Sequence, residues 1–211
     1  MREPRDTAVD RVVLDPGHGG RDPGAGADHL HEAALVLDVA HRLAARLESE
    51  TGIEVVLTRQ EDVYVSLEAR SALANEVGAD LFVSIHANAS RDRLASGIAT
   101  YHRRPHRGNH AETGPRATGS RALAELVQRH LIDRIRRLHP EVRDLGVKQE
   151  RFDVLVDTDM PGVLTEISFL SNQEEAELLS TETYRDRISD ALFDSIVAFH
   201  PPSAEPLAAD D

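Results

Sequence analysis

The sequence predicts an α/β domain whose β-sheet is covered by helices on both faces. Short apolar runs alternate along the chain with longer segments of helical spacing, the pattern of a sheet with crossover helices. No internal repeat and no linker divides the 211 residues, and 40% apolar residues suffice for one sizeable core. We therefore expect one domain over residues 11–199, between a flexible leader at 1–10 and a disordered, proline- and alanine-rich tail at 200–211.

The first elements surround a glycine-rich turn. Residues 11–14 form an apolar run that predicts a buried strand, and the turn "LDPGHGGRDPGA" follows it directly. Residues 32–50 repeat apolar side chains at helical spacing until Gly52 ends the helix. A second strand is expected at 53–57.

The middle of the chain predicts a further helix and two strands. Ser66 is placed to cap a helix over residues 66–77, and Gly78 lies at its end. Residues 81–85 are an apolar run that ends at His86, and residues 98–101 are expected to form the next strand.

The last part of the chain starts with a polar stretch at residues 102–119. Prolines and glycines within this stretch predict a loop rather than a helix. Helical spacing returns at 121–138, and Asn172 with Glu175 resembles a capping box that opens a short helix. The remaining elements are two strands and a last helix, expected at 152–156, at 163–167 and from Tyr184 to Phe199.

Four polar side chains fall near one edge of this sheet. Ligands of such sheets bind beyond the carboxyl ends of the strands. His18 follows the first strand, His86 follows the third, and Glu166 stands near the end of the last one. Glu32 begins the helix after the glycine turn and can face the same edge. Two histidines and two carboxylates are thus expected to converge.

Composition excludes several classes of function. A formal charge of −13 argues against nucleic acid and anionic lipid as partners, and Lys148 is the only lysine. The chain has no cysteine, so a metal would be held by His, Asp or Glu. No apolar stretch reaches the roughly 18 residues of a membrane span, and the first ten residues contain no signal-peptide core.

The sequence resembles the zinc-dependent N-acetylmuramoyl-L-alanine amidases, which cut bacterial peptidoglycan. The matching stretches occur in the order and at the spacing of that family and cover nearly all of residues 11–199. They are "VVLDPGHGGRDPGA", "HEAALVLDVAHRL", "VVLTRQEDVYVSLEARSALAN", "ADLFVSIHANAS", "GVKQERFDVLVDTDMPGVLTEISFLSN" and "EEAELLS".

The resemblance implies a single zinc amidase domain with a mixed, mainly parallel sheet of about six strands. Position by position, it implies that His18, Glu32 and His86 bind one zinc ion per chain and that Glu166 is the catalytic carboxylate. His31 stands where relatives often have arginine. The implied substrate is peptidoglycan or a muropeptide, and the implied location is the periplasm or cell wall, with an export signal absent from this chain.

The residue types fit this chemistry independently. Zinc binds imidazole and carboxylate while keeping a position open for water, and a glutamate can carry the proton from that water to the departing amine. The alternatives are another zinc-dependent wall peptidase or deacetylase, and a non-catalytic wall-binding module with the same fold. The preferred stem peptide and the oligomeric state stay open.

Several other polar residues admit a second reading. His29 or His31 could replace Glu32 in a metal shell, although a solvated position is the simpler interpretation. Asp15 is expected to orient the glycine turn, or to support His18 from behind. His102, His106 and His110 are expected in a solvated loop, since Pro105 and Gly108 interrupt any helix there. The segment 102–119 is accordingly expected to form no helix that plugs the site.

Overall fold

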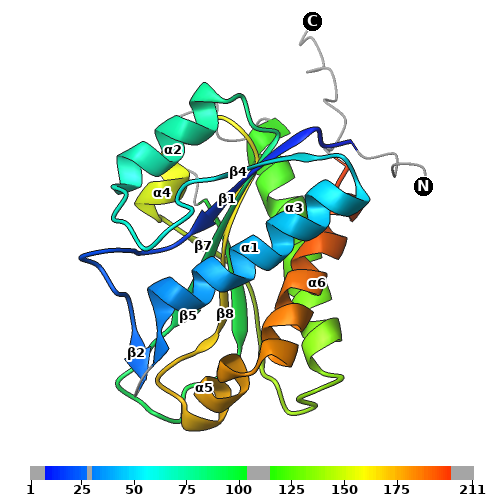
Figure 1. The fold of residues 1–211 in the computed structure, drawn as a ribbon. Coiled ribbons are helices and arrows are strands. Elements are labelled where there is room, and N and C mark those ends of the chain that lie inside the picture. Colours follow the sequence, from blue (N-terminus) through cyan, green and yellow to red (C-terminus); the bar gives the residue numbers. More distant parts are fainter. Residues whose placement is uncertain (1–7, 28–29, 104–114, 201–211) are drawn as a thin grey trace, which may run out of the picture.

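The computed structural model describes residues 8–27, 30–103 and 115–200, which form one sheet between two layers of helices (Figure 1). The sheet has six strands in the order β4-β1-β5-β8-β6-β7. All neighbouring strands are parallel except β6 and β8, which run antiparallel. The strands are β1 (Arg11–Pro16), β4 (Glu54–Leu57), β5 (Leu81–Asn88), β6 (Ile98–Arg103), β7 (Asp144–Glu150) and β8 (Gly162–Phe169).

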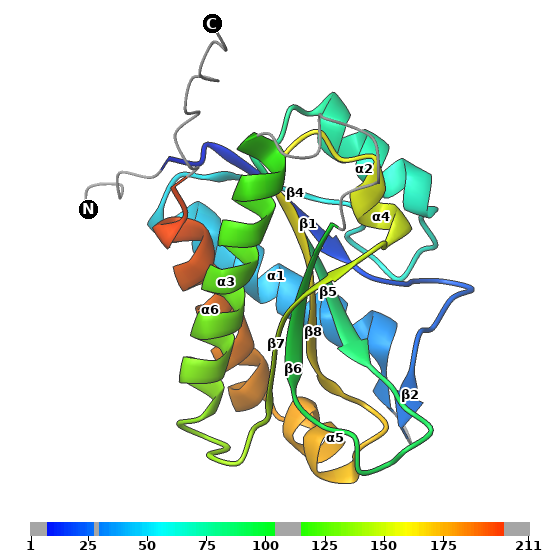
Figure 2. The same ribbon diagram turned by 180° about the vertical axis from the view of Figure 1, so that it is seen from behind.

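Helices cover both faces of this sheet. One face packs against α1 (Glu32–Glu50), α3 (Pro115–Ile135) and α6 (Glu182–Ala198), which bury the larger apolar cluster with Leu14, Val83 and Ile167. The other face packs against α2 (Leu67–Glu76) and the short α4 (Asp153–Val156), whose apolar side chains meet Val13, Phe82 and Leu164. Figure 2 shows α3 and α6 lying side by side, with α2 and α4 grouped apart from them.

Alternation along each strand explains the two clusters. Val12 and Leu14 face the larger helical layer, whereas Val13 between them faces α2 and α4. The central strands are apolar on both faces, as expected of a parallel sheet covered on both sides. The fold class, the mixed sheet and the helices on both faces are confirmed. No helix in the described ranges has the length and apolar character that a membrane span requires.

Local capping predictions are also confirmed. The Ser66 side chain accepts a hydrogen bond from the backbone N–H of Ala69, and so caps α2. Asn172 accepts from the N–H of Glu175 at the start of α5 (Gln173–Ser180), which follows β8. These side chains satisfy backbone donors that a helix start leaves without partners.

Three segments differ from the sequence prediction. Residues 152–156 were predicted as a strand, but Asp153–Val156 form α4, since a short apolar run has no decisive periodicity. Strand β7 was not predicted because it is a mostly polar edge strand with Gly146 inside it. The two-residue pair β2 (Gly26–Ala27) and β3 (Leu30–His31) is likewise too short to give a pattern.

The loop prediction for residues 102–119 is wrong at both ends. His102 is a buried residue of β6 rather than a solvated one, and α3 already begins at Pro115. A proline fits the first turn of a helix, where its missing N–H is not needed. His106 and His110 lie outside the described residues, as do most of the leader and the tail.

Candidate active site

The loop after β1 holds His18 in an uncommon backbone conformation. His18 has φ of 60°, and the neighbouring Gly19 has φ of 122°, so the chain turns sharply away from the sheet. The N–H of Gly17 donates to the carbonyl of Ile85 on β5 at 3.0 Å, which fixes the start of the loop. Strain of this kind is typical of functional sites that their surroundings hold firmly.

Asp22 orients the His18 ring from the far side of the same loop. Its Oδ2 lies 2.9 Å from Nδ1 of His18, and paired backbone hydrogen bonds between Gly19 and Asp22 close the turn. The other ring nitrogen, Nε2, points to Glu32 at 3.1 Å from Oε1. A carboxylate on one nitrogen that leaves the other for a ligand is the usual arrangement behind metal-binding histidines.

Glu32 is the first residue of α1 and is only 4% exposed. Its Oε1 lies 2.9 Å from Nδ1 of His86 and accepts from the N–H of Ala87 at 3.0 Å, while Oε2 accepts from Ala25 at 2.8 Å. Burial alone would raise the pKa of Glu32, but hydrogen bonds with His18 and His86 lower it well below its usual range. The hydrogen bond to Glu32 is the main cause that raises the pKa of His18 to about 9.

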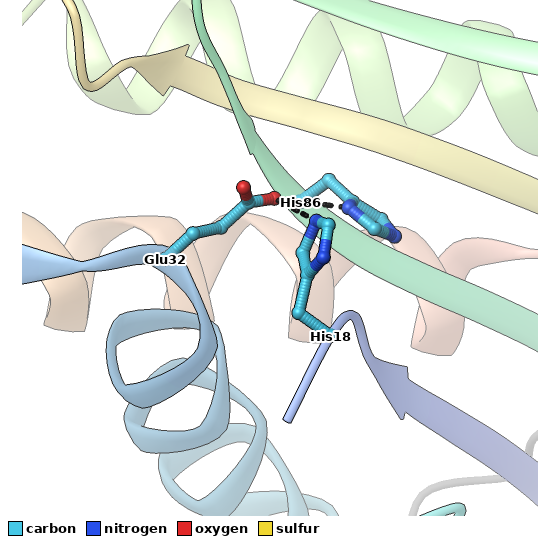
Figure 3. A group of neighbouring side chains, drawn as sticks. All are labelled: His18, Glu32 and His86. Atoms are coloured by element: carbon cyan, nitrogen blue, oxygen red, sulfur yellow. Dashed lines mark hydrogen bonds and ion pairs between the residues drawn. The ribbon is translucent and has the colours of Figure 1, made fainter. Parts of the chain in front are cut away.

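These three side chains form a group suited to a metal ion. Figure 3 shows His18, Glu32 and His86 pointing toward one another from a loop, a helix start and a strand. Their potential ligand atoms all lie within 4.8 Å of one another. Two imidazoles with one glutamate are a known ligand set of catalytic zinc, which keeps a further position open for water. The donors present therefore fit the predicted metal.

Glu166 stands beside this group on the neighbouring strand. It is the register partner of His86 in the parallel pair β5–β8, so both side chains project from the same face of the sheet. Its Oε2 is buried and has no hydrogen-bond partner in the described part of the chain. Burial raises the pKa of Glu166 to about 7, opposed by His86 and His18 and supported by Glu32. A carboxyl group that titrates near neutrality is suited to acid–base catalysis.

Two glycines are required by contacts inside the site. A Cβ on Gly17 would lie 2.2 Å from the ring of His86, and a Cβ on Gly24 would lie 2.6 Å from Oε2 of Glu32. Both distances are far below van der Waals contact, so the glycines let the loop approach the side chains of His86 and Glu32 closely.

Arg59 lies under the loop and is only 3% exposed. Its guanidinium donates to the carbonyls of Pro16 and Gly17, at 2.9 and 2.8 Å, and to that of Ala33 at 2.7 Å. It therefore joins the histidine loop to the first turn of α1. Burial lowers the pKa of Arg59, and the positive charge of Arg70 lowers it further.

Arg70 provides a second support from α2. It pairs with Asp15 at 2.7 Å, where both side chains are at most 3% exposed, and donates to the backbone carbonyl of His18 at 2.6 Å. Asp15 also accepts from the hydroxyls of Thr58 and Ser84. A buried ion pair with this many hydrogen bonds satisfies both charges.

The structure shows where each residue predicted for the site lies. His18, Glu32 and His86 come together with Glu166 beside them. His86 lies within β5, which continues to Asn88 beyond the predicted strand end. Asp15 is a buried strand residue rather than a turn residue, and it reaches the His18 backbone through Arg70. His31 is exposed on β3, and among the described residues the group that could hold a metal ion contains Glu32 instead. His29 lies outside the described residues.

Sequence reasoning missed three supporting residues, namely Asp22, Arg59 and Arg70. Asp22 carried a usable signal, since a carboxylate four positions after a turn histidine can reach its ring. Arg59 follows β4, and Arg70 lies in α2. The residues next to them in the sequence do not distinguish these two arginines from exposed, solvated ones.

The family model of N-acetylmuramoyl-L-alanine amidases matches residues 12–198. The amidase LytC of Bacillus subtilis is 35% identical over 189 residues, which are 90% of this chain and 35% of LytC. The amidase AmiA of Escherichia coli K12 is 32% identical over 219 residues, covering 89% of this chain and 75% of AmiA.

Solved structures give the same result. The N-acetylmuramoyl-L-alanine amidase of Clostridium difficile 630 superposes with a TM-score of 0.80 at 33% identity, covering 92% of this chain and 97% of that one. The AmiC2 amidase of Nostoc punctiforme superposes with a TM-score of 0.76 at 32% identity, covering 88% and 94%. The chain thus spans about a third of LytC but nearly the whole of these solved domains.

Proposed function

The chain belongs to the family of N-acetylmuramoyl-L-alanine amidases, and we propose that it hydrolyses the amide bond between the lactyl group of N-acetylmuramic acid and L-alanine in peptidoglycan. The observation that most supports this proposal is the convergence of His18, Glu32 and His86 beside a buried, unpartnered oxygen of Glu166. Together they offer a metal site and a proton carrier at one edge of the sheet.

In this proposal His18, Glu32 and His86 hold one zinc ion per chain. Zinc bound there would polarise the scissile carbonyl and acidify a water molecule. Glu32 supplies a carboxylate whose two oxygens are already oriented by the N–H groups of Ala25 and Ala87. Asp22 fixes the His18 ring, so that Nε2 faces the common centre.

Glu166 carries the proton through the reaction. Its carboxylate accepts a proton from the attacking water as the new C–O bond forms at the lactyl carbonyl. The resulting carboxylic acid then donates that proton to the L-alanine nitrogen as the C–N bond breaks. The products are a free lactyl carboxyl group and a peptide with N-terminal L-alanine. The pKa of about 7 lets Glu166 serve in both roles near neutral pH.

The proposed substrate indicates the compartment in which the enzyme acts. We place it in the periplasm or cell wall, because peptidoglycan lies there. The partner is peptidoglycan or a soluble muropeptide released from it.

The test is digestion of purified peptidoglycan by the zinc-loaded protein, followed by identification of the new chain ends. Free lactyl groups with N-terminal L-alanine would support amidase activity. New ends inside the stem peptide would identify a peptidase, free amino sugars would identify a deacetylase, and unchanged peptidoglycan would identify a binding module.

Two variants separate the proposed roles. Glu166→Gln should keep zinc and the fold but lose about 10²–10⁴-fold in turnover of a soluble muropeptide, because only the proton carrier is removed. His86→Ala should lose zinc, measured by metal analysis after equilibration at sub-micromolar free metal. Near-normal turnover by the first variant, or unchanged zinc content in the second, would contradict the assignments.

A further inference from the structure

Tyr101 and Lys148 extend the face of the sheet that carries the candidate site. On β8, Leu164 and Glu166 project to the same side, and Tyr101 of β6 is the register partner of Leu164. Lys148 of β7 is in turn the register partner of Tyr101. From His86 outward, one face therefore presents Glu166, then Tyr101, then Lys148 at the edge strand.

Tyr101 contacts Phe152 and Lys148, and it lies diagonally across from Glu166, whose direct partner on β6 is Ala99. The Tyr101 ring packs edge-on against Phe152 with centroids 5.1 Å apart, and the Lys148 Nζ lies 5.7 Å from the centre of the same ring. Burial raises the pKa of Tyr101, and the charges of Glu166 and Glu150 raise it further. Tyr101 thus senses the charge of Glu166 from the adjacent strand.

The charge of Lys148 is unusual in this chain. It is the sole lysine in a protein of formal charge −13, it is exposed, and no carboxylate pairs with it within the described ranges. Arginines of the helical layer, such as Arg42 and Arg134, pair with acidic residues. Glu150 lies two positions along β7, and its carboxylate accepts from the N–H of Arg151. A solvated cation is thus left beside the site.

The role of Glu166 tells which part of the substrate lies on this side. In the proposed function, Glu166 delivers its proton to the departing L-alanine nitrogen, so the stem peptide leaves from the Glu166 side of the site. Strands are about 4.8 Å apart and Lys148 is level with Leu164, so its Cα lies about 10 Å across the sheet and about 7 Å along it from that of Glu166. Two residues of extended peptide span about 7 Å, and the Lys148 side chain lies back over Tyr101 toward β8.

We propose that Tyr101 and Lys148 form a subsite for the stem peptide, in which the Lys148 ammonium binds the free carboxylate of the residue after L-alanine and the Tyr101 ring supports the peptide beside it. This inference rests on the proposed amidase function and adds a preference for an anionic residue at that position. Substrates that carry a carboxamide there lack the charge that Lys148 recognises.

The test uses two synthetic muropeptides that differ only in this group. Both contain L-alanine followed by a γ-linked D-glutamyl residue, whose α-carboxyl is free in one and a carboxamide in the other. Lys148→Met should raise KM for the carboxylate substrate about 3- to 10-fold with little change in kcat. It should leave KM for the carboxamide substrate within twofold, and Lys148→Arg should restore the carboxylate preference. A salt concentration of 0.5 M should weaken the preference of the unsubstituted enzyme.

Arg129→Met is the matched control, because Arg129 is an exposed cation on α3, on the opposite layer. It should leave both KM values unchanged. An equal rise in KM for both substrates in Lys148→Met, or no rise for either, would overturn the subsite. Hydrolysis of neither substrate by the unsubstituted enzyme would instead contradict the proposed function itself, which keeps the two failures distinct.

Discussion

Replacing Gly17 with alanine should separate metal binding from folding. The added Cβ would lie 2.2, 2.4 and 2.7 Å from Cε1, Nε2 and Nδ1 of His86, whereas ordinary contacts are about 3.5 Å. The ring must therefore move by more than about 1 Å. Ligand distances in metal sites tolerate only about 0.2 Å, so the displaced imidazole can no longer serve as a ligand.

The expected magnitudes differ for the two properties. The ring is the end of a side chain that can rotate, so overpacking should lower the free energy of unfolding of the metal-free protein by about 1–3 kcal/mol. Zinc affinity should fall at least about 100-fold, or about 3 kcal/mol, through loss of a properly placed ligand. Urea unfolding gives the first quantity, and competition with a chromophoric chelator gives the second.

Two controls sharpen this comparison. Gly78→Ala introduces a Cβ that meets nothing within 4 Å, but at φ of +61°, so it should cost about 1–2 kcal/mol of stability and leave zinc affinity unchanged. In a background of His86→Ala, the effect of Gly17→Ala on the free energy of unfolding should largely disappear, because the ring that the added Cβ displaces is gone. Zinc binding by Gly17→Ala at the unsubstituted affinity would refute the reasoning.

Three further predictions concern the residues around the site. Asp22→Asn should weaken zinc binding about 10- to 100-fold in chelator competition, since it removes the anion that orients His18, and an unchanged Kd would contradict this role. Arg59→Met should lower the free energy of unfolding by about 2–5 kcal/mol in urea, because the carbonyls of Pro16, Gly17 and Ala33 each lose one hydrogen bond, although Pro16 keeps that from Arg70; a loss below about 1 kcal/mol would show that these hydrogen bonds are dispensable. The pKa of Glu166 is raised by burial from 4.5 to about 7, so the folded, metal-free protein favours the protonated carboxyl and loses stability as pH rises through that interval. Glu166→Gln removes this loss, and its stability relative to the unsubstituted protein should increase by up to roughly 3 kcal/mol between pH 5 and pH 8; a difference independent of pH would argue against the raised pKa.

The sequence predicted the α/β class because its patterns fit few other structures. Residues 32–50 have a long helical periodicity, and β1, β5 and β8 are short apolar runs. The sequence also predicted which four residues converge, since strand ends of a parallel sheet lie at one edge. The resemblance supplied their chemical roles, and these stay proposals.

Other features depend on tertiary contacts that leave no local pattern. The run at residues 152–156 has strand-like composition, yet packing against α2 and Leu164 makes it a helical turn. His102 has the sequence surroundings of a polar loop residue, but it is a buried residue of β6. An arginine such as Arg59 is usually found at the surface. Its burial is explained only by the carbonyls of the histidine loop that accept its hydrogen bonds.

The pairing of His86 with Glu166 has a consequence for motion. His86 belongs to β5 and Glu166 to β8. These are the two central strands, and helices on both sides enclose their backbone hydrogen bonds. Opening such strands requires nearly complete unfolding, unlike the fraying of loops and edges. Amide hydrogen exchange at these positions should therefore be among the slowest in the molecule. Heat should accordingly abolish catalysis through global unfolding of the domain.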